Sequence, residues 1–271
     1  MIQYLHLGRV GYGEALALQQ ELVELRHQGR IDNTLLLLEH PPVLTLGRNA
    51  SRANILATDD MLARKGVTVH EINRGGDVTY HGPGQLVGYP IFDLRSLKNA
   101  TGGRLGPVDY VRRMEEALIR LCAGYGVLTG RVQGRTGVWT NTVPGREKKI
   151  GAIGVHVSRG ITSHGFAFNL STDLRDFQWI VPCGIADREV TSLDLEIPDP
   201  AQLPTLEQLA DTAARHFGQV FDQQILALSG LDALRSNLIE QVGIPMQVPE
   251  EVQRLMGNAT GSDPASSPVR V

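Results

Sequence analysis

The chain has 271 residues, of which 42% are hydrophobic and 20% are charged, and its formal net charge at pH 7 is −3. This composition is typical of a globular protein with a sizeable core, and the charge provides no overall attraction to nucleic acid or to anionic lipid. The two cysteines, Cys122 and Cys183, are too few for a disulfide framework, so we expect a reducing, cytoplasmic environment.

The N-terminal segment lacks the basic start, long apolar stretch and small-residue cleavage pattern of a secretory signal. No run approaches the roughly 18 apolar residues that are needed to span a bilayer. We therefore predict a protein whose partners include neither nucleic acid nor a membrane.

Helical spacing of apolar residues predicts helices over residues 14–28, 109–125 and 206–221. Short β-rich runs bounded by Gly, Pro or Asn predict strands at residues 34–38, 67–70, 86–92 and 163–168, and we expect these to form one central sheet. A further glycine-rich strand is predicted at 150–156. This mixture predicts an α/β (α+β) fold in which helices flank a largely antiparallel or mixed sheet.

The domain organisation is predicted from changes in composition along the chain. Residues 1–230 are expected to form the main domain, and residues 231–256 a C-terminal helical extension. Residues 257–271 are rich in Gly, Ser, Pro and Ala, have little to bury, and are predicted to be a disordered tail.

The two cysteines have different sequence contexts. Cys122 follows Leu118 at the i, i+4 spacing of an amphipathic helix, which predicts an inert core thiol. Cys183 lies between Pro182 and Gly184, in a turn that exposes the side chain. From this context a nucleophile and a packed turn cysteine are about equally expected.

A thiol of ordinary pKa is only slightly ionised at neutral pH, so a nucleophilic cysteine requires a base or a positive neighbour. Lys149 is the best candidate, because the strand that it begins lets one of Lys148 and Lys149 point inward and the other toward water. A solvated surface lysine is the more common alternative. If the amine and the thiol are adjacent, they titrate as a coupled pair and share one proton.

The most informative segment is the glycine-rich run at residues 74–85, which reads Arg-Gly-Gly-Asp-Val-Thr-Tyr-His-Gly-Pro-Gly-Gln. It matches neither a Walker sequence nor a dinucleotide-binding fingerprint, and a single copy is not an RNA-binding repeat. A plain hairpin turn is one interpretation. We favour a site loop whose glycines allow the backbone to approach a bound thioester or acyl chain.

This segment, together with Lys149-Ile-Gly-Ala-Ile-Gly154 and Pro182-Cys183-Gly184, resembles the lipoyl(octanoyl) transferase family. These enzymes move an octanoyl group from acyl carrier protein to a lysine of lipoyl domains. The resemblance covers about residues 1–225. It implies the mixed-sheet fold of the biotin and lipoate protein ligases. Gly151 stands where many members carry alanine, and we expect a local widening of the strand without an effect on the chemistry.

The resemblance also implies roles for individual residues. Cys183 would be the acyl-thioester nucleophile and Lys149 the residue that lowers its pKa and handles protons. His81 would be a supporting hydrogen-bonding residue and not a third catalytic group. The residues implied to line the acyl pocket are Arg74, Gly75, Gly76, Asp77, Val78, Thr79, Tyr80, His81, Ala152, Ile153, Gly154, Gly165, Phe166 and Ala167.

The implied partners are octanoyl-acyl carrier protein as donor, and the lipoyl domains of 2-oxoacid dehydrogenase complexes and the glycine cleavage H protein as acceptors. No cofactor is expected, because the thioester is already activated, and the protein is expected to be a monomer. His81, His156 and His164 show no metal-ligand spacing, so no metal is predicted. The alternatives are an ATP-dependent lipoate ligase and a non-catalytic protein that binds acyl carriers or lipoyl domains.

Overall fold

The computed structural model describes residues 1–140, 146–181, 189–236 and 238. The chain divides into a unit of Met1–Ile239 and a second unit of Glu240–Val271, and all described residues belong to the first. None of the helices in these residues is long and apolar enough to cross a bilayer.

The described residues contain an eight-stranded sheet with the strand order β11-β1-β2-β6-β10-β9-β8-β7. β1 pairs in parallel with β2 and β11, and the other neighbours are antiparallel, so the predicted mixed sheet is confirmed. The strands are β1 (Ile2–Arg9), β2 (Asn33–Glu39), β6 (Gln85–Ile91), β7 (Thr129–Val132), β8 (Arg135–Thr140), β9 (Lys148–Ser158), β10 (Ile161–Asn169) and β11 (Ile225–Ala227).

A second, three-stranded sheet has the order β4-β3-β5, from β3 (Val43–Leu46), β4 (Thr68–Glu71) and β5 (Val78–His81). It corrects two predictions. The strand predicted at 67–70 exists but does not belong to the central sheet. The glycine-rich run at 74–85 is not a loop throughout, because Val78 and Tyr80 face a buried cluster with Leu44 and Ile180, and this burial favours a strand.

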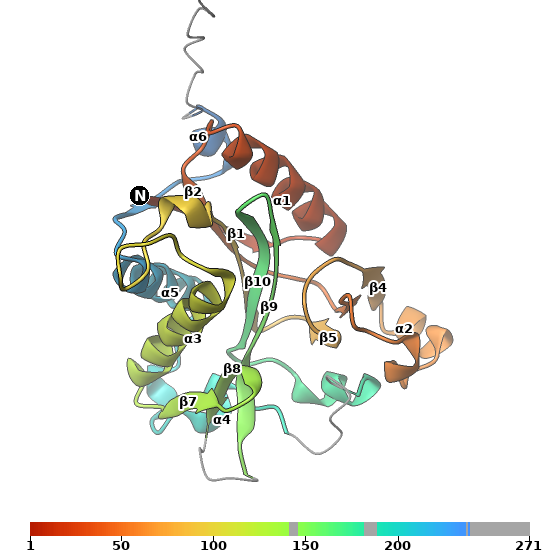
Figure 1. The fold of residues 1–271 in the computed structure, drawn as a ribbon. Coiled ribbons are helices and arrows are strands. Elements are labelled where there is room, and N and C mark those ends of the chain that lie inside the picture. Colours follow the sequence, from red (N-terminus) through yellow and green to blue (C-terminus); the bar gives the residue numbers. More distant parts are fainter. Residues whose placement is uncertain (141–145, 182–188, 237, 239–271) are drawn as a thin grey trace, which may run out of the picture. The chain divides into compact units, whose positions relative to one another are not determined.

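The three predicted long helices are confirmed as α1 (Tyr12–His27), α3 (Pro107–Ala123) and α5 (Leu206–Phe221). α3 begins with proline at its first position, where no hydrogen-bonding N–H is lost, and α5 begins with a capping box between Thr205 and Gln208. Figure 1 shows α3 and α5 on one side of the large sheet and α1 on the other.

Shorter helices join these elements: α2 (Asp59–Arg64), α4 (Leu193–Glu196), α6 (Leu231–Ser236), and the 3-10 segments η1 (Arg52–Asn54), η2 (Leu94–Ser96), η3 (Leu174–Trp179) and η5 (Pro200–Gln202). Leu234 of α6 is buried in the cluster that also contains Leu5 and Leu22. The predicted domain boundaries at residues 230 and 256 remain predictions.

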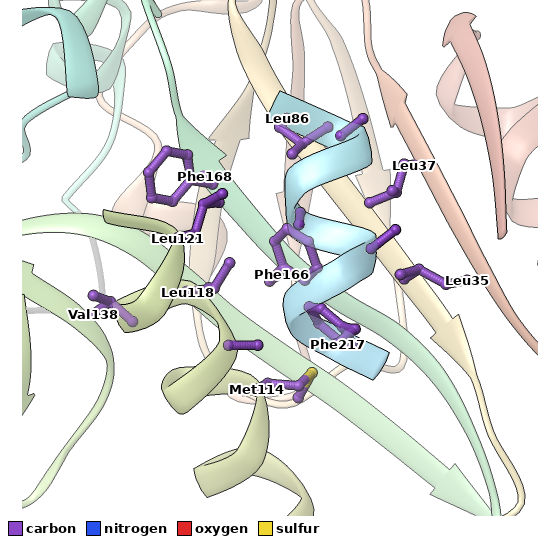
Figure 2. Packing of buried hydrophobic residues seen from close by; sticks show 14 of the residues in the cluster. Leu35, Leu37, Leu86, Met114, Leu118, Leu121, Val138, Phe166, Phe168 and Phe217 are labelled. Atoms are coloured by element: carbon purple, nitrogen blue, oxygen red, sulfur yellow. The ribbon is translucent and has the colours of Figure 1, made fainter. Parts of the chain in front are cut away.

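The main core lies between the large sheet and the helices α3 and α5 (Figure 2). Phe217 of α5 stacks on Phe166 of β10, with ring centroids 5.4 Å apart and ring planes 26° apart. Leu118 and Cys122 of α3 are fully buried in the same cluster. Burial raises the pKa of the Cys122 thiol to about 12, which agrees with its prediction as an inert core residue.

Candidate active site

A cavity of about 420 Å³ lies against β9 and β10, within the size range of small-molecule sites. The described site residues predicted from the sequence line it, with one exception. They are Lys149, Arg74, Gly75, Gly76, Asp77, Val78, Thr79, His81, Ala152, Ile153, Gly154, Gly165, Phe166 and Ala167. These residues come from three separate stretches of sequence, and the fold brings them to one place.

The exception is Tyr80, which does not line the cavity. Its ring is 1% exposed and packs edge-on against Phe177 and Trp179, at centroid distances of 5.5 and 5.8 Å. Its hydroxyl donates to Asp176 Oδ2 at 2.6 Å. Since neighbouring residues of a strand face opposite sides, His81 faces the cavity while Tyr80 fixes β5 to the η3 segment.

Glycines allow residues 74–76 to pack directly on β9. Gly75 N donates to Val155 O at 2.9 Å, and a Cβ atom at Gly154 would lie 2.8 Å from Gly75 O. The buried Arg74 side chain donates to the carbonyl and the hydroxyl of Thr45, at 2.7 and 2.9 Å. The glycines of this segment therefore bring backbone close to backbone and so form one wall of the cavity.

Lys149 faces the cavity, with its Nζ 4.7 Å from the centroid of the Trp139 ring. Lys148 instead forms an exposed ion pair with Glu189 at 3.5 Å. The Lys149 backbone is held by Glu189 O, which accepts from its N–H at 3.0 Å, and by the N–H of Thr191, which donates to its carbonyl at 2.9 Å.

Cys183 lies outside the described residues, but both chain ends that flank residues 182–188 are described. On one side, Val181 N donates to Asn54 O at 2.8 Å, and the nearby Phe177 lines the cavity. On the other side, Val190 also lines the cavity and forms a parallel bridge with Lys149. The described residues on both sides of this segment therefore lie near residues that line the cavity, and Val190 lies beside Lys149.

His81 is buried and hydrogen-bonded within the site. Its Nδ1 lies 2.8 Å from Gln85 Oε1, and Gln85 Nε2 donates to Asn169 Oδ1 at 2.9 Å. Burial lowers the pKa of His81 from 6.5 to about 3, with smaller contributions from His40, Arg74 and His164. His81 is therefore neutral at physiological pH.

A layer of aromatic and imidazole rings lies behind His81, and the sequence prediction did not include it. Tyr12 of α1 stacks on His81 with centroids 6.3 Å apart, and Tyr12 and Tyr89 both line the cavity. His40 Nδ1 donates to Val10 O at 2.7 Å, so its Nε2 accepts from the Tyr89 hydroxyl at 2.7 Å. Burial lowers the pKa of His40 to about 4. The Tyr residues carry no local sequence signal beyond their aromatic character.

His164 also lines the cavity and has a left-handed backbone, with φ 57°. Its Nε2 lies 2.7 Å from Asn73 Oδ1, and burial lowers its pKa to about 4. His156, by contrast, is not part of the cavity lining. Within the described ranges, no group of three or more His, Cys, Asp or Glu side chains is arranged to hold a metal ion.

Comparison with known proteins places this chain in a family. Residues 11–218 match the family of lipoyl protein ligase A/B catalytic domains. An octanoyltransferase of Acidobacterium capsulatum is 66% identical over 232 residues, covering 84% of this chain and 93% of the relative. The chain belongs to the octanoyltransferase family. A second octanoyltransferase, from Koribacter versatilis, is 52% identical and covers 94% of this chain and 97% of its own.

Solved structures support the fold of this octanoyltransferase family member. A putative lipoate protein ligase from T. acidophilum with bound lipoic acid has a TM-score of 0.64 at 16% identity, covering 87% of this chain and 92% of its own. Lipoate-protein ligase A bound with ATP has a TM-score of 0.62 at 15% identity, covering 87% and 94%. At these identities the likeness is one of fold, and it confirms the predicted ligase-like α/β architecture.

Proposed function

We propose that this protein transfers an octanoyl group from octanoyl-acyl carrier protein to the target lysine of lipoyl domains, in the cytoplasm, through a thioester on Cys183. The observation that carries the proposal is the identity of 66% to an octanoyltransferase over nearly its whole length. The cavity supports it, because the described residues that the family resemblance assigns to the acyl pocket, except Tyr80, line one cavity.

The cavity suits an alkyl chain. Phe166, Ala167, Ala152 and Ile153 provide apolar surface along the neighbouring strands β9 and β10. Burial of six methylene groups at about 0.8 kcal/mol each contributes roughly 5 kcal/mol of binding free energy. Two carbons fewer would reduce binding roughly tenfold or more, so the pocket discriminates against shorter acyl chains.

Lys149 acts on the sulfur of Cys183. Its ammonium group is directed into the cavity from a strand whose backbone is hydrogen-bonded to residues 189 and 191, directly after the segment that contains Cys183. A positive charge beside the sulfur favours the thiolate and lowers the pKa of Cys183, and a cysteine nucleophile requires this lowering.

The reaction then proceeds in two half reactions. The Cys183 thiolate attacks the donor thioester, backbone N–H groups near Lys149 and Cys183 stabilise the oxyanion, and the carrier thiol leaves with a proton from Lys149. The acceptor lysine attacks the enzyme thioester, an amide forms, and the sulfur of Cys183 is released. Neither half reaction consumes ATP, because the acyl group is already activated.

The acceptors that we propose are lipoyl domains of 2-oxoacid dehydrogenase complexes and the glycine cleavage H protein, and the enzyme acts as a monomer. One solved structure with this fold comes from an archaeal system that comprises a lipoate protein ligase and its E2 lipoyl domain, which supports an acceptor of this class.

Intact-protein mass spectrometry tests the proposal. After mixing with octanoyl-acyl carrier protein, the wild-type protein should gain the mass of one octanoyl group, and Cys183→Ala should gain none. Cys122→Ala is the matched control and should gain the adduct as the wild type does. Transfer to a lipoyl domain only in the presence of ATP would instead indicate a lipoate ligase, and binding without any adduct would indicate a non-catalytic protein.

A further inference from the structure

A continuous chain of hydrogen bonds connects His81 with the strand that carries Lys149. His81 Nδ1 lies 2.8 Å from Gln85 Oε1, and Gln85 Nε2 donates to Asn169 Oδ1 at 2.9 Å. Asn169 Nδ2 donates to Thr191 O at 2.9 Å, and Thr191 N donates to Lys149 O at 2.9 Å. Gln85 is 1% exposed and Asn169 is 4% exposed, so water does not compete for these hydrogen bonds.

The backbone carbonyl of Thr191 determines which atom donates and which accepts in each side-chain hydrogen bond from Asn169 to His81. Thr191 O can only accept, so the amide NH₂ of Asn169 faces it, and Asn169 Oδ1 faces Gln85 as an acceptor. Gln85 must then present its NH₂ to Asn169, and the same NH₂ donates to Tyr80 O at 3.3 Å. Gln85 Oε1 therefore accepts from His81, whose Nδ1 carries the hydrogen.

This direction determines what His81 offers to the cavity. In a neutral imidazole with a hydrogen on Nδ1, Nε2 holds a lone pair and acts only as an acceptor. The ring stays neutral, because burial and the neighbouring His40, Arg74 and His164 all lower its pKa. With a pKa of about 3, the ring is a poor base that accepts a hydrogen bond without removing the proton.

Strand pairing places His81 at the Lys149 end of the cavity. Gln85 pairs with Asn169 across β6 and β10, and Phe168 pairs with Gly151 across β10 and β9, so Asn169 lies near the start of β9. Neighbouring strands are about 4.8 Å apart, which puts Gln85 two strand spacings from β9. The opposite end of the ladder, where His164 pairs with Val155, is further from Lys149 along β9.

We propose that Gln85 and Asn169 are positioning residues that hold His81 with its hydrogen on Nδ1, and that His81 Nε2 accepts a hydrogen bond from the amine of the acceptor lysine as it attacks the enzyme thioester. This inference rests on the proposed function. The amine nitrogen forms a bond with the acyl carbon, the carbon–sulfur bond breaks, and the amine proton goes to Lys149, which becomes an ammonium again beside the released Cys183 thiolate. His81 orients the amine and gains no proton.

Two measurements test this role. The first is ¹⁵N NMR of the histidine side chains in the free enzyme, with His81→Ala used to assign the signals. We expect His81 to carry hydrogen on Nδ1 alone from pH 5 to 8, and Gln85→Met and Asn169→Leu to shift it toward a mixture of tautomers. Hydrogen on Nε2 of the wild-type ring would overturn the proposal.

The second measurement separates the two half reactions. His81→Ala should slow transfer from the octanoyl adduct to a lipoyl domain about tenfold more than it slows formation of the adduct, and tenfold is the value of one hydrogen bond. Gln85→Met should show a smaller loss in the same step. His156→Ala, on β9 but outside the cavity lining, is the matched control and should leave both rates unchanged.

Failure of this inference is distinguishable from failure of the proposed function. If the wild-type enzyme forms no octanoyl adduct, the proposed function is wrong. If the adduct forms and His81→Ala transfers it at the wild-type rate, or if both half reactions slow equally, the role of His81 in orienting the amine is wrong.

Discussion

Gly88, at the centre of the large sheet, provides a direct test of how tightly the sheet is packed beneath the cavity. A Cβ atom at Gly88 would lie 2.1 Å from Cε1 and 2.3 Å from Cζ of Phe166 on the neighbouring strand. The ring has little room to withdraw, because Phe217 of α5 stacks against it at 5.4 Å. Gly88→Ala therefore forces a side chain or the backbone to move.

Overpacking of this kind typically costs about 1–3 kcal/mol, and the confined ring favours the upper end, about 3 kcal/mol. In a domain of this size each kcal/mol lowers the melting temperature by about 2–4 °C, so we expect a decrease of roughly 6–12 °C in calorimetry or circular dichroism. Gly88→Ala combined with Phe166→Leu should lose less stability than the sum of the two single variants, because the smaller side chain leaves room for the new methyl group.

Gly13→Ala is the matched control. Gly13 lies in the first turn of α1, and a Cβ atom there would approach nothing closer than His70 Cε1 at 4.0 Å. Alanine favours the helix, so this variant should gain up to about 1 kcal/mol. A Gly88→Ala protein that melts at the wild-type temperature would show that Phe166 is not confined as described.

Three further outcomes are expected. In the native protein Cys122 should resist alkylation at pH 8, because burial raises its pKa to about 12, and mass spectrometry should find it modified only after denaturation. Burial lowers the pKa values of His40, His81 and His164, so below pH 6.5 the unfolded state binds more protons than the folded state. The free energy of unfolding, measured with urea, should therefore fall by up to about 1.4 kcal/mol per pH unit for each histidine as the pH decreases toward 4. An unchanged free energy of unfolding between pH 7 and 5 would contradict this. Glu115→Ala should destabilise the protein by about 1–3 kcal/mol in the same urea assay, because the loss of its fully buried carboxylate leaves the Gly137 N–H of β8 unpaired and removes the acceptor of two partly exposed arginines; an unchanged free energy of unfolding would show that these bonds contribute little.

The sequence was sufficient to predict the helices and strands that have a local pattern of apolar residues. The long helices were recognisable because apolar residues repeat at helical spacing over four or more turns, and the strands β2 and β6 because they are nearly continuous apolar runs. β1 was missed because Gln3 and His6 interrupt its pattern. Its strand conformation comes from parallel pairing with β2 and β11, which lie far away in the chain.

The candidate site likewise contains residues that the sequence identified and residues that it did not. The motif identified the cavity lining from Arg74 to Thr79, because glycines that permit close backbone contact leave a recognisable local pattern. It did not distinguish Tyr80 from its neighbour His81, since only the pairing of β5 with β3 decides which of the two faces the cavity.

The amino-acid sequence by itself determined the type of fold, the family and the identity of the residues that meet at the cavity, since these depend on local spacing and on a distinctive motif. Only the tertiary structure decided that Tyr12 and Tyr89 join them, and that Asn169 sets the orientation of Gln85 and through it the tautomer of His81. The reason is physical. A hydrogen-bond direction is fixed by partners brought together across strands, and no property of either segment alone contains it.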